Sequence, residues 1–129
     1  MIKRILFVCV ENSCRSQMAE GFAKGLGKGI IEAHSAGSRP SGKVNPLAIE
    51  LMKDVGIDIS KAVSKGFDDL PIKDFDLAVT LGCKDTCPFV PADKRLEWEI
   101  EDPQGKDKAF FCEVRDKIKE KVADLVNCL

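Results

Sequence analysis

The sequence predicts an α/β fold, in which a central parallel sheet of four strands forms the middle layer of a three-layer sandwich. Short apolar runs bounded by polar turns recur along the chain, and segments with apolar residues three or four positions apart separate them. Strands that alternate with helices in this way are typical of right-handed βαβ units. The length of 129 residues suits one domain over residues 1–129 with a single main core.

The first half of the chain predicts two strands and two helices. Residues 5–8 form a continuous apolar run, which is typical of a strand buried on both faces. Residues 18–26 then carry apolar side chains at helical spacing. A second strand is expected at residues 30–35. Asn45 and Pro46 are expected to open the second helix, as its N-cap and its first-turn proline.

The second half predicts two more strands and a long final helix. Residues 75–81 are expected to form the third strand, and residues 95–98 a shorter fourth strand. The final helix shows the clearest periodicity, with apolar residues at Phe111, Val114, Ile118, Val122 and Leu125. In parallel sheets the ligand site lies beyond the carboxyl ends of the strands, so we expect it in the loops that follow the strands.

Composition narrows the classes of function and the compartment. Twenty basic residues against twenty-one acidic ones argue against a non-specific nucleic-acid binder or a membrane-surface binder. The apolar run at the start ends too early for a signal peptide, and no apolar stretch approaches the length of a membrane span. We therefore expect a cytoplasmic protein whose six cysteines are free thiols. A single histidine leaves little material for His-based zinc sites, and we expect no metal and no cofactor.

The loop after the first strand has the features of an oxyanion cradle with a nucleophile. Cys9 ends the strand, and Arg15 and Ser16 open the next helix. Successive backbone N–H groups, the helix N-terminus and the Arg15 guanidinium would all favour a tetrahedral anion and the Cys9 thiolate, to which Ser16 can donate a hydrogen bond. The alternative is a buried strand-end cysteine beside a surface arginine. The expected oxyanion-binding residues are Val10, Glu11, Asn12, Ser13, Cys14, Arg15 and Ser16.

Residues 9–21, together with motifs such as His34-Ser35-Ala36-Gly37, Cys87-Pro88 and Asp102-Pro103, carry a resemblance to a known family. The chain resembles the cysteine-loop arsenate reductases, which share the fold of low-molecular-weight protein tyrosine phosphatases, over nearly its whole length. Phosphatases of this fold typically have proline after Arg-Ser, and Asp-Pro-Tyr with further tyrosines near the pocket. This chain has Gln17 and Gln104 at those positions and no tyrosine. The resemblance thus favours the reductase; the alternative is a phosphatase acting through a phosphocysteine.

The resemblance implies a relay of three cysteines. Cys9 attacks arsenate, a second cysteine attacks the Cys9 sulfur and releases arsenite, and a third resolves the new disulfide. Cys83 and Cys87 stand where the family has the later two, although the best-known reductases have a longer interval between them. One helical turn would place their Cα atoms about 6 Å apart, within the disulfide range. Thioredoxin or a similar thiol reductant would regenerate the enzyme. A packing pair or half of a metal site is the alternative.

Asp102 matches the general acid of the family, which protonates the oxygen that leaves as Cys9 attacks. An ordinary turn or helix-capping aspartate is the alternative. Glu11 replaces the glycine that the family usually has in the loop, and would be strained there if that position needs a positive φ.

The resemblance also implies side chains that support the loop: Asn12, Ser16, Glu20, Ser35 and Lys65. Some relatives bind a potassium ion with groups that correspond to three of these, Asn12, Glu20 and Ser35, and with an acidic residue at the position of Lys65. Our hypothesis is that the Lys65 ammonium takes the place of that ion, so that potassium is not required.

The remaining cysteines, Cys14, Cys112 and Cys128, are expected to have no part in the chemistry, with Cys14 buried at the start of the helix. A non-enzymatic sensor of oxyanions or of redox state is a third class of function. An intact cradle together with Asp102 argues against it, because a sensor needs no general acid.

Overall fold

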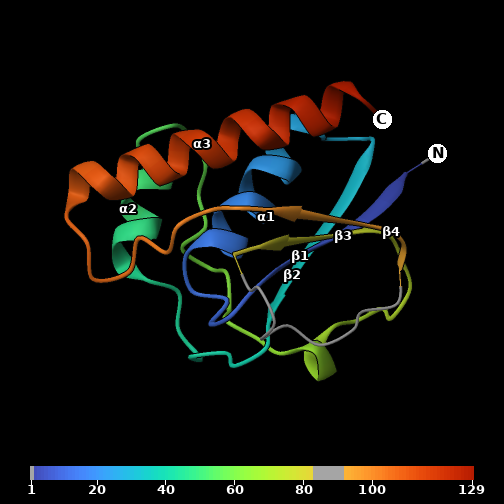
Figure 1. The fold of residues 1–129 in the computed structure, drawn as a ribbon, viewed down its shortest axis with the longest axis horizontal. Coiled ribbons are helices and arrows are strands. Elements are labelled where there is room, and N and C mark those ends of the chain that lie inside the picture. The colour runs from blue at the N-terminus through green and yellow to red at the C-terminus, as the bar shows by residue number, and fades with distance from the viewer. Residues whose placement is uncertain (1, 83–91) are drawn as a thin grey trace.

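The computed structural model describes residues 2–82 and 92–129, and its strands form one parallel sheet in the order β2-β1-β3-β4 (Figure 1). The predicted relay cysteines Cys83 and Cys87 lie outside the described residues. The elements are β1 (Lys3–Cys9), α1 (Arg15–Leu26), β2 (Ile31–Gly37), α2 (Pro46–Lys53), the 3-10 helix η1 (Phe67–Asp69), β3 (Phe75–Leu81), β4 (Ala92–Trp98) and α3 (Lys108–Asn127).

The continuous apolar run of β1 makes it the central strand, because both of its faces are covered. Ile5 and Phe7 point into the larger apolar cluster, and Leu6 and Val8 point into a smaller cluster on the opposite face. All four side chains are fully buried. The prediction of a strand buried on both faces is confirmed.

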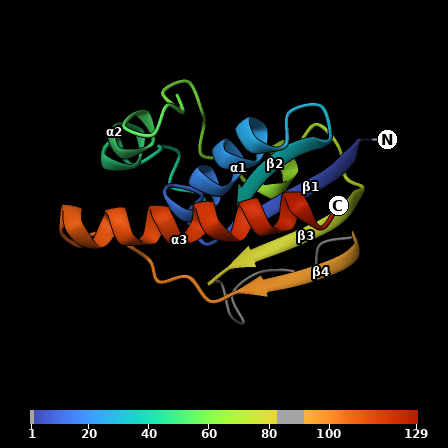
Figure 2. The same ribbon diagram turned by 90° about the horizontal axis from the view of Figure 1, so that it is seen from above.

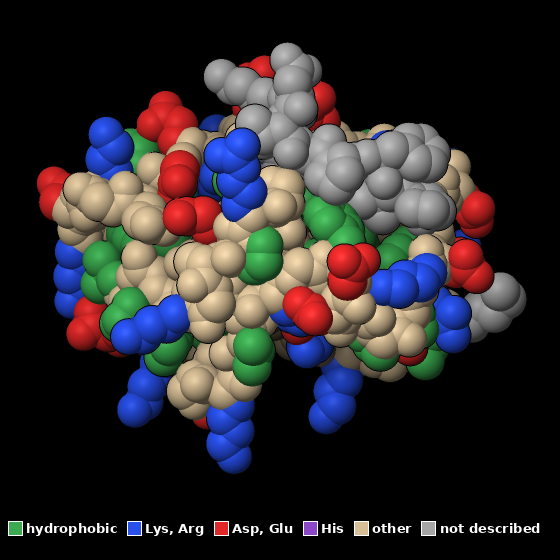
Figure 3. Space-filling model, turned by 90° about the horizontal axis from the view of Figure 1, so that it is seen from below, with side chains coloured by type: hydrophobic (Ala, Val, Ile, Leu, Met, Phe, Trp, Pro, Cys, Tyr) green, Lys and Arg blue, Asp and Glu red, His purple; other side chains and the backbone are tan. Residues whose placement is uncertain are grey.

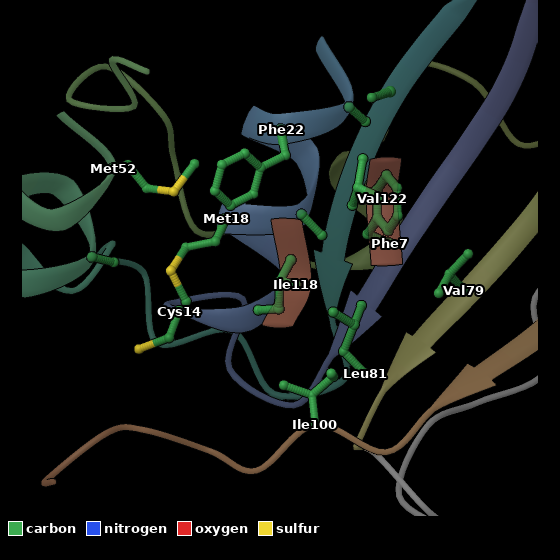
Figure 4. Packing of buried hydrophobic residues seen from close by; sticks show 14 of the residues in the cluster. Phe7, Cys14, Met18, Phe22, Met52, Val79, Leu81, Ile100, Ile118 and Val122 are labelled. Atoms are coloured by element: carbon green, nitrogen blue, oxygen red, sulfur yellow. The ribbon is translucent and has the colours of Figure 1, made fainter. Parts of the chain in front are cut away.

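The three α-helices lie on one face of the sheet and build the larger cluster. Met18 and Phe22 of α1 pack between β1 and the other helices, together with Met52 of α2 and Ile118 of α3 (Figure 4). The side chain of Asn45 accepts a hydrogen bond from the Leu47 N–H at 2.9 Å, which confirms the predicted N-cap of α2. The apolar stripe of α3 is likewise buried from Phe111 to Val122.

The opposite face of the sheet is covered by the chain around η1. Leu70 and Phe75 pack there against Leu6, Val8 and Ala78. In Figure 1 this segment lies below the sheet, while α3 runs above it. The predicted α/β class with a four-stranded parallel sheet is confirmed, with a third layer that consists of connecting chain and a 3-10 helix. Figure 3 views this side, where acidic and basic side chains are interspersed and hydrophobic ones form small separate groups.

Several element boundaries differ from the prediction, mainly because pairing with a neighbouring strand decides where a strand begins and ends. β2 extends to Gly37, because its last residues pair with the end of β1, whereas Ile30 precedes the strand and is exposed. β4 begins at Ala92, which pairs with Phe75. Leu26 was expected on the buried stripe of α1, but it is exposed because it is the last residue of the helix.

All strands point the same way, so the carboxyl ends of β1, β3 and β4 meet at one edge of the sheet (Figure 2). The loop after Cys9 and the segment after Trp98 come together at this edge, as the topology rule predicts. No helix within residues 2–82 and 92–129 has the length and apolar character that crossing a membrane requires.

Candidate active site

The loop between β1 and α1 is held from outside through its carbonyl groups. The carbonyls of Cys9, Val10 and Glu11 accept hydrogen bonds from the N–H groups of Ser38, Arg39 and Ser41, and the Ser13 carbonyl accepts one from Asn45. Since a carbonyl and the N–H of the following residue point in opposite directions, the loop N–H groups face its concave side. An oxyanion cradle requires this orientation of the backbone.

Gly37 lets the loop lie this close to the sheet. A Cβ atom at Gly37 would stand 2.5 Å from the Val10 carbonyl oxygen and 2.9 Å from the Asn12 nitrogen. Any larger residue at the end of β2 would therefore push the loop away from β2.

Asn12 turns the chain at the middle of the loop with φ of +52°, the one positive φ of a non-glycine residue in the described chain. The strain expected at Glu11 thus falls on Asn12, and asparagine tolerates the left-handed region better than glutamate does. Its side chain is fully buried, accepts a hydrogen bond from the Lys65 N–H at 3.0 Å, and donates one to the Ser16 hydroxyl at 2.6 Å.

The Cys9 sulfur lies on the inner side of this loop and is almost fully buried. The Ser16 hydroxyl oxygen is 2.8 Å from it, and the Asn12 N–H donates to it across 3.3 Å. The sulfur thus has two hydrogen-bonding neighbours beside the N-terminus of α1.

Arg15 and Asp102 meet at the mouth of the loop. Arg15 is buried, donates to the Ile100 carbonyl at 3.0 Å, and has its Nη2 3.8 Å from Asp102 Oδ2. The Asp102 side chain is 47% exposed, so it can exchange protons with solvent. Gly82 provides space for the guanidinium, since a Cβ there would collide with Arg15.

These side chains line a narrow pocket formed by Cys9, Glu11, Ser13, Cys14, Arg15, Asp102 and Gln104. Glu11 is half-buried and lines the pocket, and within residues 2–82 and 92–129 no side-chain cation lies within ion-pair distance of it. Glu11 therefore adds a negative charge beside an anion site, opposite in sign to Arg15.

A second cluster supports the loop from behind, around the buried carboxylate of Glu20. The Ser35 hydroxyl donates to it, and the Lys65 ammonium lies 3.7 Å from Glu20 Oε1. Lys24 is closer still, with Nζ 2.6 Å from Glu20 Oε2. Our sequence reasoning missed Lys24, although its spacing of four residues from Glu20 on one helix would have indicated the pair.

Gln17 is a further residue that sequence reasoning did not place in the site. Its side-chain nitrogen is 2.8 Å from Asn12 Oδ1, 3.2 Å from the Asn12 carbonyl oxygen and 3.0 Å from the Val63 carbonyl oxygen. Val63 comes from a segment far away in the sequence, so no local pattern indicates this contact.

Three further cysteines and the histidine lie within the described residues. Cys14 is buried at the start of α1, and burial raises the pKa of its thiol to about 12. Cys112 packs partly against the core, while Cys128 is exposed. His34 contacts Glu32 and the ring of Phe75. Among the described residues, no three His, Cys, Asp or Glu side chains gather where they could hold a metal ion.

Replacing Cys14 by alanine is expected to flatten the pH dependence of the free energy of unfolding above pH 9. The unfolded thiol ionises around its ordinary pKa of 9.0, whereas the native thiol keeps its proton up to about 12. Between these values the unfolded chain binds fewer protons, so the wild type loses stability as pH rises, by at most about 1.4 kcal/mol per pH unit. Urea unfolding from about pH 8 to about pH 11 measures this slope.

The exposed Cys128 provides the matched control, and Cys128→Ala should keep the wild-type slope. Parallel slopes for the wild type and Cys14→Ala would contradict the burial of an un-ionised thiol in the loop.

Comparison with known proteins places this geometry in a family. Residues 4–129 match the sequence profile of the family described as low molecular weight phosphotyrosine protein phosphatase. A protein of Synechocystis sp. named glutaredoxin arsenate reductase is 43% identical over 128 residues, with 97% of each chain covered. An arsenate reductase of Staphylococcus aureus is 49% identical over 121 residues, with 91% of each chain covered.

A solved structure described as an arsenate reductase in the phosphate binding state superimposes with a TM-score of 0.87, at 41% identity and with 98% of each chain covered. The family match extends over nearly the whole chain, and both the loop with Cys9 and Arg15 and the segment with Asp102 fall inside it. The chain therefore belongs to the low molecular weight phosphotyrosine protein phosphatase family.

Proposed function

We propose that this chain is an enzyme that reduces arsenate to arsenite. The observation that carries the proposal is the position of the Cys9 sulfur, which accepts a hydrogen bond from the Asn12 N–H on the inner side of an anion-binding loop, within the same pocket as Arg15 and Asp102. The similarity to proteins named arsenate reductases supports arsenate as the oxyanion.

In the first step the Cys9 thiolate attacks the arsenic atom and forms a sulfur–arsenic bond. The loop N–H groups and Arg15 stabilise the negative charge on the arsenate oxygens. Asp102 donates its proton to the oxygen that leaves as water. Arg15 keeps the Asp102 carboxyl near the pocket, since their side chains approach to 3.8 Å.

The second step transfers two electrons. Cys83 as a thiolate attacks the Cys9 sulfur, the sulfur–arsenic bond breaks, and its electron pair reduces arsenic to the trivalent state, which leaves as arsenite. Cys87 then attacks the Cys83 sulfur, releases Cys9 as a thiolate and leaves a Cys83–Cys87 disulfide. A dithiol donor, thioredoxin or a similar protein such as glutaredoxin, reduces this disulfide, which suits a cytoplasmic setting. No cofactor is needed, because thiols supply both electrons.

Hydrolysis of phosphate esters is the competing function, because Cys9, Arg15 and Asp102 would suffice for it. The residues beside the pocket argue against a phosphotyrosine substrate. Gln104 lines the pocket where phosphatases of this fold have tyrosine, and the chain contains no tyrosine to stack on an aryl group.

Mapping disulfides after a single exposure to arsenate tests the relay. The reduced wild type should form a Cys83–Cys87 disulfide, because Cys87 resolves the intermediate. Cys87→Ser should accumulate a Cys9–Cys83 disulfide instead, since no thiol remains to resolve it. Mass spectrometry of peptides from the alkylated protein identifies both bonds.

Two controls decide the outcome. Cys9→Ser should form neither disulfide with arsenate, and Cys128→Ser should behave as the wild type. Rapid phosphatase turnover without any arsenate-dependent disulfide would overturn the proposal in favour of a phosphatase.

Lys65 is proposed to serve as the cation behind the loop, together with Lys24. The Lys65 ammonium lies 3.7 Å from Glu20 Oε1, within reach of the carboxylate that would otherwise attract a free cation. The melting temperature and the arsenate turnover should therefore agree, to within about 1 °C and about 20%, in potassium and in sodium chloride of equal ionic strength. A marked gain in potassium alone would refute the assignment.

A further inference from the structure

The amide of Gln17 ties together three oxygen atoms behind the candidate active-site loop. Its Nε2 atom lies within hydrogen-bond distance of both oxygens of Asn12 and of the Val63 carbonyl oxygen. The side chain is almost fully buried, so water does not compete for these bonds. Two N–H groups therefore join α1, the loop and the distant segment around Val63.

The chemistry of these partners requires a donor at this position. All three atoms around Nε2 are acceptors, and two of them are main-chain carbonyls that cannot donate. The reverse orientation of the amide would direct its oxygen at other oxygens. A side chain without N–H groups would leave buried carbonyls unpaired, which costs more than the hydrogen bonds themselves contribute.

Gln17 acts on the residue whose conformation is hardest to maintain. Asn12 has a left-handed backbone, and its N–H group donates to the Cys9 sulfur. The Gln17 amide contacts Asn12 at both its main-chain and its side-chain oxygen, so it restrains the peptide and the side chain together. The Asn12 side chain also donates to Ser16, the second group that contacts the sulfur.

We propose that Gln17 is a positioning residue for the nucleophile, which acts by holding Asn12 so that the Asn12 N–H and the Ser16 hydroxyl both face the Cys9 sulfur. Gln17 has no hydrogen bond to Cys9 itself and does not line the pocket with it. The inference rests on the proposed function only in that Cys9 is taken as the nucleophile.

The charged groups around the sulfur are separate from Gln17. Glu11, Arg15 and Asp102 line the pocket with Cys9, and the Glu20 cluster lies behind the loop. A neutral substitution at Gln17 leaves all these charges in place. A change in the reactivity of Cys9 would then report on the geometry of the loop.

The test compares Gln17→Met, which keeps the length of the side chain and removes its donors, with Gln17→Glu, which keeps the shape and supplies acceptors when ionised. Reduced full-length protein is alkylated with iodoacetamide, and the rate at Cys9 is followed by peptide mass spectrometry at about pH 7 and about pH 10. The rate at the lower pH is divided by the rate at the higher pH. This ratio corrects for access of the reagent to Cys9, because most cysteines are ionised at the higher pH.

In both variants this ratio should fall by about tenfold, because the thiolate loses the hydrogen bonds that favour it at neutral pH. Ile118→Val, a destabilising change in the core on α3, is the control for lower stability and should keep the ratio within about twofold of the wild type. If Gln17→Met does not fold, Gln17→Leu, which is also neutral and also lacks a donor, takes its place.

A wild-type ratio in the Gln17 variants would overturn the proposal. So would a ratio that falls in Gln17→Met and stays unchanged in Gln17→Glu, since shape alone would then explain the role. The readout does not involve arsenate. Failure of arsenate reduction in the wild type would therefore count against the proposed function and leave this test intact.

Discussion

The left-handed backbone of Asn12 sets the direction of the loop after β1, and the candidate site depends on that direction. The loop carbonyls on either side of Asn12 accept hydrogen bonds from the segment after β2, and the loop N–H groups point the opposite way. A left-handed backbone at Asn12 costs free energy. The buried hydrogen bonds of its side chain to Ser16, Gln17 and Lys65 offset this cost. Most of the contacts described around the loop either hold Asn12 in this conformation or depend on it.

The same constraint explains how similar thiols acquire different chemistry. Cys9 and Cys14 stand at the two ends of one loop, and both are buried. The Cys9 sulfur receives hydrogen bonds from the loop, whereas desolvation dominates at Cys14 and raises the pKa of its thiol to about 12. The two thiols therefore differ in their hydrogen-bond partners although both are buried beside the same pocket.

The parts of the fold that depend on local pattern could be predicted, and the parts that depend on distant pairing could not. The apolar run of β1, the cap at Asn45 and the stripe of α3 are visible in the sequence and are confirmed. The start of β4 was missed, because its exposed polar residues form a strand only by pairing with β3. For the site, the loop could be predicted from the spacing of Cys9 and Arg15, and Asp102 from the resemblance to the family. The contact between Gln17 and Val63 could not be named, because 46 positions separate the two residues.

If the chain's own thiols supply the electrons that reduce arsenate, a single turnover should consume thiols in a fixed ratio to the arsenite formed. Measuring that ratio is the most direct test of the relay. Fully reduced protein is mixed with excess arsenate in the absence of any reductant, and arsenite and remaining thiols are counted in the denatured product. We expect about one arsenite per chain and about two thiols lost for each arsenite, with neither change in Cys9→Ser. An unchanged thiol count without arsenite, in protein that hydrolyses a phosphate ester over many turnovers, would contradict it.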